Sequence, residues 1–127
     1  MPDATRAFVK SLGNDDLKKS GVEVLCVNTY HLFLQPGLKI IKEAGGIHKF
    51  MNWKGPVISD SGGYQIFSLI HKNPGQGEIT DEKAVFKSPL DGKKRELTPE
   101  KSIEIQFDLG ADMMVALDDV PPNNYPK

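Results

Sequence analysis

The amino-acid sequence predicts an α/β protein with a mainly parallel sheet. Three short apolar runs have strand character: "VEVLCVN" (22–28), "GPVISDS" (55–61) and "ADMMVALDD" (111–119). Segments with helical features lie between them, and this alternation is typical of parallel sheets because parallel neighbours need a crossover connection. The runs are nearly continuously apolar, the pattern of strands buried on both faces. The 127 residues form about one small globular domain.

Two helices are predicted before the second apolar run. In "NDDLKKSG", Asn14 is the expected N-cap, acidic residues occupy the first turn, lysines follow and Gly21 ends the helix. The segment "GLKIIKEAG" (37–45) has the spacing of a second helix. Together with its two flanking runs, this segment predicts a βαβ unit.

A further helix is predicted before the third run, in "TPEKSIEIQFDLG" (98–110). Thr98 is a suitable cap, Pro99 suits the first helical position and Gly110 ends the segment. Ile103 and Phe107 are four residues apart and therefore share one face.

An inserted β-hairpin is predicted over "EITDEKAVFKSPLDGKKREL" (78–97). The segment alternates in polarity and contains Asp91-Gly92, a strong two-residue turn signal. Its basic tip is either a solvated turn or a contact for a nucleic-acid backbone. The residues concerned are Lys93, Lys94 and Arg95.

Composition excludes several classes of function. With 16 basic and 17 acidic residues, the chain has no overall positive field to attract nucleic acid, so any such contact must be local. Cys26 is the single cysteine, which excludes an internal disulfide and favours a buried structural thiol. His31, His48 and His71 lack metal-ligand spacing. No run approaches the roughly 20 apolar residues that span a bilayer, and we expect a cytoplasmic protein without membrane contact.

Polar residues follow each predicted strand. Asn28 ends the first run, Asp60 and Ser61 end the second, and Asp118 and Asp119 end the third. Ligands of parallel α/β proteins bind beyond the carboxyl ends of the strands. Each residue alone is better explained as a cap or turn former. Three strand ends in register favour a ligand site.

The residues after Ser61 leave two interpretations open. Gly62 and Gly63 permit either a close approach of the backbone to a flat ligand or merely a tight turn. Tyr64 either covers such a ligand or packs against the protein. Carboxylates suit a ligand with several N–H donors, and guanine presents such an edge.

Four motifs together resemble the tRNA-guanine transglycosylases, also called queuine tRNA-ribosyltransferases. They are "NTYHLFLQPG" (28–37), "SDSGGYQIFSL" (59–69), "TPEKSIEIQFDLGAD" (98–112) and "ALDD" (116–119). The opening "MPDATRAFVKSL" also resembles an early family segment, so the resemblance covers nearly all of residues 1–127. The "NTYHL" and "DSGG" forms are similar to the bacterial and eukaryotic branch of the family.

The resemblance implies a (β/α)8 barrel that exchanges guanine at the tRNA wobble position for a 7-deazaguanine, queuine or its precursor, through a covalent enzyme–tRNA intermediate. It implies that Asp60 is the general acid/base, with Ser61 beside it. Tyr64 would stack on the purine, Asp118 would accept from its N–H edge and Asn28 would line the ribose side. Gly62 and Gly63 would border the base.

The length and one substitution depart from the family pattern. A complete barrel takes about 250 residues, so the resemblance implies roughly the first half of a barrel, with two unpaired sheet edges. The nucleophilic aspartate and the Cys and His zinc ligands would lie in a C-terminal part that this chain lacks. Val120 stands where bacterial members usually have cysteine, which leaves the preferred deazaguanine open.

Two hypotheses of function remain. The chain is part of a base-exchange transferase that is inactive alone, or it is a shortened, non-catalytic homologue that binds a purine or tRNA or supports a partner. Under the first hypothesis, Lys93, Lys94 and Arg95 are candidate contacts to the tRNA backbone. Homodimers or heterodimers are possible under both.

Overall fold

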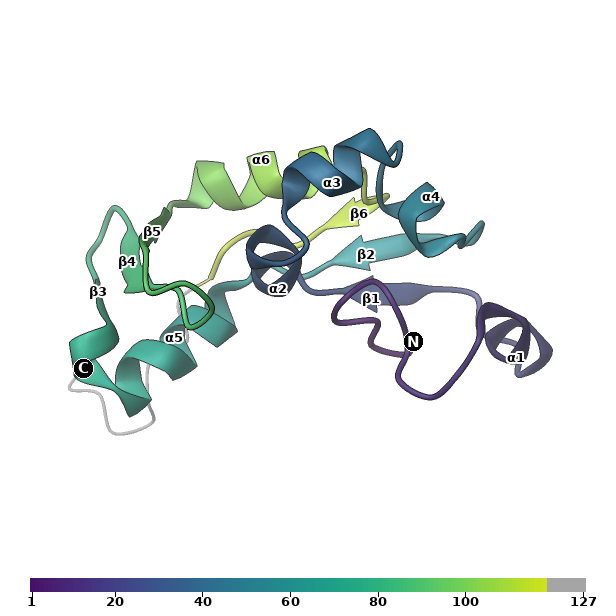
Figure 1. Cartoon of the computed structure of the whole chain (residues 1–127), viewed down its shortest axis with the longest axis horizontal. Helices are drawn as coiled ribbons and strands as arrows, with labels where there is room; N and C mark the ends of the chain where they lie inside the picture. The colour runs from purple at the N-terminus through teal and green to yellow at the C-terminus, as the bar shows by residue number, and fades with distance from the viewer. Residues whose placement is uncertain (119–127) are drawn as a thin grey trace.

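The computed structural model describes residues 1–118 and has a mixed α/β fold with two sheets. The first sheet contains β1 (Leu25–Val27), β2 (Val57–Ser59) and β6 (Met113–Met114) in the order β1-β2-β6. All of its pairings are parallel (Figure 1). The predicted parallel sheet is therefore confirmed, with strands shorter than the apolar runs.

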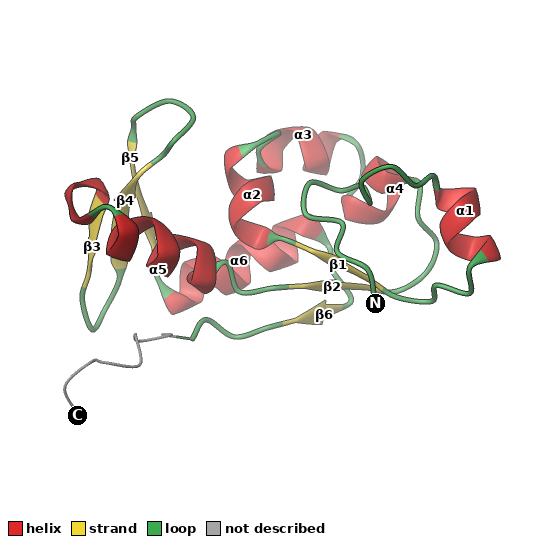
Figure 2. Cartoon of the chain, turned by 90° about the horizontal axis from the view of Figure 1, so that it is seen from below, coloured by secondary structure: helices red, strands yellow, loops and turns green. Residues whose placement is uncertain are grey.

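Only one face of this sheet is buried in the described chain. Leu25, Val27 and Val57 are fully buried, whereas Cys26 and Ile58, which point to the other face, are half-buried. Figure 2 shows α2, α3 and α4 on one side of the strands. The prediction of strands buried on both faces was wrong for this reason.

The helices between β1 and β2 are α2 (Thr29–Leu34), α3 (Leu38–Glu43) and α4 (Ile47–Met51). Together with the sheet they enclose one hydrophobic core. The helix at residues 99–109 also contributes to this core, whose fully buried members are Ala4, Leu25, Val27, Leu32, Ile41, Ile47, Val57, Ile105 and Leu109. Within residues 1–118, no helix combines the length and the apolar character needed to cross a membrane.

The first helix, α1 (Asn14–Lys19), begins one residue earlier than predicted. Gly13 is the N-cap, and Asn14 is the first helical residue. The Asn14 amide instead donates to the carbonyls of Met51 (2.8 Å) and Asn52 (2.9 Å), which ties α1 to the end of α4. The Asn14 side chain therefore makes long-range hydrogen bonds to the end of α4 and does not cap α1.

The edge of the sheet beyond β1 is partly covered by the N-terminal residues. Asp3 forms a parallel bridge with Cys26. The N–H of Ala4 donates to the Cys26 carbonyl (2.6 Å), and the N–H of Cys26 donates to the Pro2 carbonyl (3.0 Å). The expectation of two unpaired edges was therefore wrong for this edge, while β6 has no outer strand partner within residues 1–118.

The crossover helix α6 (Pro99–Leu109) has the predicted ends. The Thr98 hydroxyl accepts from the Lys101 N–H (3.1 Å), and Gly110 adopts the left-handed conformation after the last turn. The face that carries Ile103 and Phe107 is not the buried face of the helix, because Phe107 is 69% exposed. The buried residues are Ser102, Ile105, Gln106 and Leu109.

Gln106 explains this choice of face. Its side-chain oxygen accepts from the Ser59 hydroxyl (2.7 Å) and from the Val115 N–H (3.1 Å), and its nitrogen donates to the Val115 carbonyl (3.0 Å). A fully buried amide needs such partners. Gln106 thus joins α6 to β2 and to the segment after β6.

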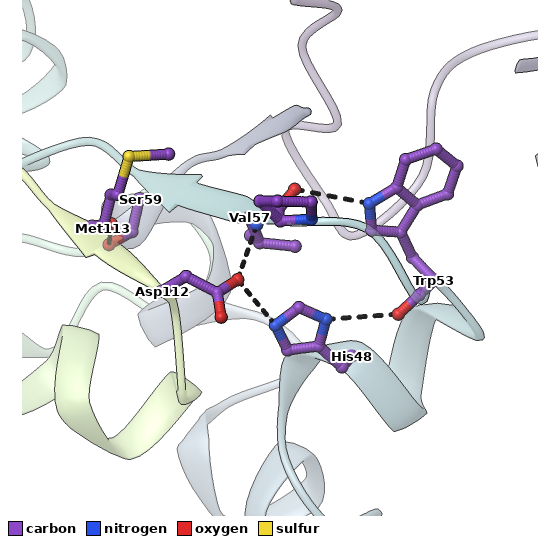
Figure 3. A network of polar contacts seen from close by, with 7 residues as sticks. His48, Trp53, Val57, Ser59, Asp112 and Met113 are labelled. Carbon is purple, nitrogen blue, oxygen red and sulfur yellow. Dashed lines mark hydrogen bonds and ion pairs between the residues drawn. The ribbon is translucent and has the colours of Figure 1, made fainter. Parts of the chain in front are cut away.

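The start of β6 is anchored to β2 and α4 (Figure 3). The Asp112 carboxylate accepts from the Val57 N–H (2.7 Å), and the Asp112 N–H donates to the Val57 carbonyl (2.9 Å). His48 Nε2 lies 3.0 Å from the same carboxylate, and His48 Nδ1 lies 3.2 Å from the Trp53 carbonyl. His48 therefore has a structural role, and these contacts align the amino ends of both strands.

The second sheet lies beyond α5 (Gly63–Lys72) and a short 3-10 turn, η1 (Pro74–Gln76). It contains β3 (Gly77–Ile79), β4 (Ala84–Lys87) and β5 (Lys94–Leu97), all antiparallel. The predicted hairpin is confirmed as β4-β5, although its connection is longer than a two-residue turn and a third strand joins it. Figure 1 shows this sheet at the end of the molecule occupied by α5.

Candidate functional site

The carboxyl ends of β1 and β2 bring Asn28 and Asp60 together. The Asn28 amide donates to one Asp60 carboxylate oxygen, and the Thr29 N–H donates to the other (2.8 Å). The Thr29 hydroxyl also donates to the Asp60 carbonyl (2.5 Å). Thr29 was missed in the sequence, although it occupies the first helical position after Asn28, where an N–H without an intrahelical partner is expected.

Asn28 also has the structural role that the sequence left open. It is the N-cap of α2, and its side-chain oxygen accepts from the His31 N–H (2.9 Å). The residue is 5% exposed. Both ends of its amide are therefore used within the protein, and its expected contact with ribose stays a prediction.

Asp60 has a perturbed pKa at the carboxyl end of β2. Burial raises the pKa of Asp60 above its ordinary value, and the hydrogen bonds from Thr29 and Asn28 limit that rise. The carboxyl group is half-buried and faces the start of α2. A carboxyl group with a raised pKa is suited to holding and releasing a proton.

Ser61 connects the strand end of β2 to the segment after β6. Its hydroxyl donates to an Asp118 carboxylate oxygen (3.2 Å) and accepts from the Gly63 N–H (3.2 Å). Its carbonyl accepts from the Ser102 hydroxyl (2.7 Å). The structure thus places Ser61, Gly63 and Asp118 together, while Asp119 and Val120 lie outside the described residues.

Close packing within the protein explains both glycines. Gly62 has φ +78°, and an added Cβ would lie 3.1 Å from the Tyr30 nitrogen. A Cβ on Gly63 would lie 2.8 Å from the Asp118 carbonyl oxygen. The absence of a side chain at Gly62 therefore allows α2 to pack closely, and its absence at Gly63 allows the Asp118 backbone to do so. These contacts account for both glycines without a ligand.

Tyr64 lies in a different hollow from Asp118. Its side chain is 60% exposed and lines a groove of about 350 Å³ together with Tyr30 and His31. Gly63 and Asp118 instead border a cavity of about 230 Å³ whose lining includes Ile66. The predicted site residues thus form two groups that meet at the start of α5.

The basic residues of the hairpin are not equivalent. Lys93 is exposed in the turn, and Lys94 begins β5 opposite Lys87. Arg95 is half-buried, with its Nη2 3.1 Å from an Asp91 carboxylate oxygen and its guanidinium 5.5 Å from the centre of the Phe33 ring. The assignment of all three to the hairpin tip was therefore wrong, because β5 begins at Lys94.

No group of three His, Cys, Asp or Glu side chains within residues 1–118 is arranged to hold a metal ion. Cys26 is a free, half-buried thiol. Burial raises the pKa of this thiol, and the nearby Asp60 carboxylate raises it further. The zinc implied by the resemblance therefore has no ligand set among the described side chains.

Comparison with known proteins shows the family. The family model described as Queuine tRNA-ribosyltransferase matches residues 1–127. The chain belongs to the queuine tRNA-ribosyltransferase family. This confirms the family suggested by the sequence motifs.

Curated relatives of this family align with nearly all of the chain. A queuine tRNA-ribosyltransferase of Prochlorococcus marinus (strain MIT 9515) is 52% identical over 123 residues, which cover 97% of this chain and 32% of the relative. Those of Lactiplantibacillus plantarum and Roseiflexus sp. are 51% and 42% identical over 96% of the chain. The chain spans about a third of the length of these relatives.

Proposed function

We propose that this chain is the base-binding and proton-transfer part of an enzyme that exchanges guanine in tRNA for a 7-deazaguanine. The observation that carries the proposal is the Asp60 carboxyl, half-buried with a raised pKa where β1 and β2 end. Membership of the queuine tRNA-ribosyltransferase family supplies the reaction class. The tRNA and the two bases are the proposed partners, and the tRNA substrate implies a cytoplasmic location.

The arrangement of strands supports a partial (β/α)8 barrel. The segment around Asp3, then β1, β2 and β6 follow one another across the sheet in chain order, and all pairings are parallel. A doubly wound sheet would reverse its strand order and carry helices on both faces. Consecutive parallel strands with helices on one face are the arrangement of a barrel wall.

The proposed exchange has two covalent steps. A carboxylate outside the matched motifs attacks the ribose anomeric carbon, and the bond between that carbon and the guanine nitrogen breaks. Asp60, when protonated, gives its proton to the departing guanine. Asp60, now ionised, takes a proton from the incoming deazaguanine, whose nitrogen attacks the anomeric carbon and releases the enzyme carboxylate.

Asp60 must change partners to perform this role. Both of its carboxylate oxygens accept hydrogen bonds from the start of α2 in the present structure. We propose that a bound base draws the side chain away from Asn28 and Thr29. Burial raises the pKa of Asp60, so at any given pH the protonated form that donates the proton is more populated than for an exposed aspartate.

The proposed base contacts come from both sides of the start of α5. Asp118 accepts from the N–H edge of the purine and is oriented by Ser61. Tyr64 is exposed and stacks on the ring, which offsets the cost of removing the target base from its stack. Asn28 lines the ribose side, and Gly62 and Gly63 keep the backbone close to the base.

The proposal also covers the contacts to the tRNA backbone, the zinc ion and the nucleophilic aspartate. Lys93 and Lys94 are exposed and contact the tRNA backbone, whereas Arg95 chiefly supports the hairpin. Zinc and the nucleophilic aspartate belong to a part of the enzyme outside this chain. We therefore expect the chain alone to bind the base without exchanging it.

Binding of guanine to the chain tests the proposal. Asp118→Asn should weaken binding by about tenfold or more, because hydrogen bonds to a charged group contribute about 1.5–3 kcal/mol. Tyr64→Ala should have a similar effect, since stacking contributes about 1–3 kcal/mol per base. Isothermal titration calorimetry measures both constants directly.

Phe107→Ala is the matched control. Phe107 is 69% exposed on α6 and Tyr64 is 60% exposed on α5, so both variants remove an exposed aromatic ring. Guanine binding should be unchanged in the control. Equal guanine affinities in all variants would reject the proposed base-binding site. Incorporation of labelled guanine into tRNA by the chain alone would contradict the expectation that exchange needs a nucleophilic aspartate from outside this chain.

A further inference from the structure

Buried hydrogen bonds connect α6 to the Asp118 carboxylate. The Ser102 hydroxyl donates to the Ser61 carbonyl (2.7 Å), and the Ser61 hydroxyl donates to an Asp118 carboxylate oxygen (3.2 Å). Asp118 itself is exposed and therefore accessible to a ligand. We propose that Ser102 and Gln106 are positioning residues that orient Asp118 toward the exchanged base, an inference that rests on the proposed function.

The Ser61 hydroxyl has a fixed direction in this network. It has a single proton, which it donates to Asp118, and its oxygen accepts from the Gly63 N–H (3.2 Å). The backbone that carries this hydroxyl is held by Ser102, which is fully buried and whose own oxygen accepts from Gln106 Nε2 (3.2 Å). The position of the Asp118 carboxylate therefore depends on a buried side chain of α6.

Gln106 holds the segment that leads to Asp118. Strand β6 pairs with β2 as far as Met114, and the next residue, Val115, donates its N–H to the Ser59 carbonyl (3.2 Å). Gln106 adds two bonds at the same place, because its side-chain oxygen accepts from the Val115 N–H (3.1 Å) and its nitrogen donates to the Val115 carbonyl (3.0 Å). This contact from α6 therefore fixes the backbone shortly before Asp118.

All hydrogen-bonding positions of the Gln106 amide are used. Its oxygen accepts from the Ser59 hydroxyl (2.7 Å) as well as from Val115, and its nitrogen donates to Ser102 as well as to Val115. A reversed amide would place its oxygen against the Val115 carbonyl. Since any other arrangement leaves a buried polar group without a partner, the network holds one geometry.

The orientation of Asp118 matters because guanine presents two donors on one edge, the ring N–H and the exocyclic amine. A carboxylate accepts from both donors only when its plane matches that edge. Hypoxanthine has the ring N–H but lacks the amine, whereas stacking on Tyr64 suits either base. The preference for guanine over hypoxanthine therefore depends on how Asp118 is oriented.

Ser102→Ala tests the inference in the full chain. Isothermal titration calorimetry measures the affinities for guanine and hypoxanthine, and the unchanged chain should prefer guanine by about tenfold or more, the value of a hydrogen bond to a charged group. This preference should fall by about twofold or more in Ser102→Ala, which is the lower end of the coupling within one hydrogen-bond network. Ser102→Thr keeps the hydroxyl and should retain the preference.

Thr98→Ala is the matched control. It also removes a hydroxyl from the start of α6, but this hydroxyl accepts from the Lys101 N–H and caps the helix. Thr98→Ala should lower stability in urea without changing the preference for guanine. An unchanged preference in Ser102→Ala, or equal changes in Ser102→Ala and Thr98→Ala, would overturn the inference.

A double variant shows whether Ser102 acts through Asp118. In an Asp118→Ala background there is no carboxylate to orient, so Ser102→Ala should no longer alter the preference, and an effect that persists would overturn the inference. Guanine binding that does not depend on Asp118 would overturn the proposed function as well. Binding that depends on Asp118 but not on Ser102 would overturn the inference alone.

Gln106→Leu tests the second contact. Leucine keeps much of the buried volume but removes both side-chain bonds to Val115. Amide hydrogen exchange at Val115 should accelerate more than at Cys26, whose N–H pairs with the Pro2 carbonyl at the other edge of the sheet, and the preference for guanine should fall. Equal acceleration at both amides, or an unchanged preference, would overturn the role of Gln106.

Discussion

At the scale of single residues, Asp60 combines an expected position with unexpected partners. Its place after β2 was predicted from the sequence, but its contacts with Asn28 and Thr29 depend on the pairing of β1 with β2. Burial opposes its charge more strongly than these donors favour it, and the net effect is a raised pKa. The same balance that suits proton transfer costs stability when Asp60 is ionised.

This cost gives Asp60→Asn a pH-dependent effect on folding. Because the folded pKa exceeds the unfolded value of about 3.9, the stabilising contribution of Asp60 is fully present below that pH and is lost as pH rises through the folded pKa. The free energy of unfolding of the unchanged chain minus that of Asp60→Asn should therefore increase toward acid pH. Urea denaturation at several pH values measures this difference, and a decrease toward acid pH would contradict the raised pKa.

At the scale of elements, local sequence determined the ends of α6 but not its buried face. Thr98 and Gly110 act where the capping pattern placed them. The exposed Phe107 and buried Gln106 reverse the order expected from hydrophobicity. Ser59 and Val115 supply the partners that make burial of Gln106 favourable, and both belong to other parts of the chain.

Removing the cap of α6 should lower stability. Thr98→Ala deletes the oxygen that accepts from the Lys101 N–H, and loss of such a cap costs about 0.5–2 kcal/mol. Thr98→Ser keeps the oxygen and should retain most of the stability. Thermal and urea denaturation compare the two variants, and equal losses in both would show that the hydroxyl does not stabilise the helix.

At the scale of the whole molecule, the parallel sheet is covered on one face. Figure 2 shows α2, α3 and α4 on one side of the strands. Cys26, Ile58 and Met113 are aligned on the opposite face, where Met113 is 44% exposed. An apolar face of this kind favours association with another surface.

We expect the chain to self-associate through this face. Met113→Lys should shift sedimentation-velocity profiles toward the monomer, because a charge placed on the open face opposes its burial. Ile40→Lys is the control, since Ile40 is 49% exposed on α3, a helix on the covered side. A monomeric unchanged chain, or equal effects of both substitutions, would contradict this expectation.

The sequence by itself determined the alternation of strands and helices, the inserted hairpin, the family motifs and the order of polar residues at the strand ends. These features depend on short-range patterns, which neighbouring residues specify. Tertiary structure decided which sheet face is buried, that Gln106 lies inside, that Asp60 faces Thr29 and that Tyr64 and Asp118 border different hollows. Those outcomes depend on contacts between segments far apart in the chain, where packing and hydrogen-bond partners outweigh local preference.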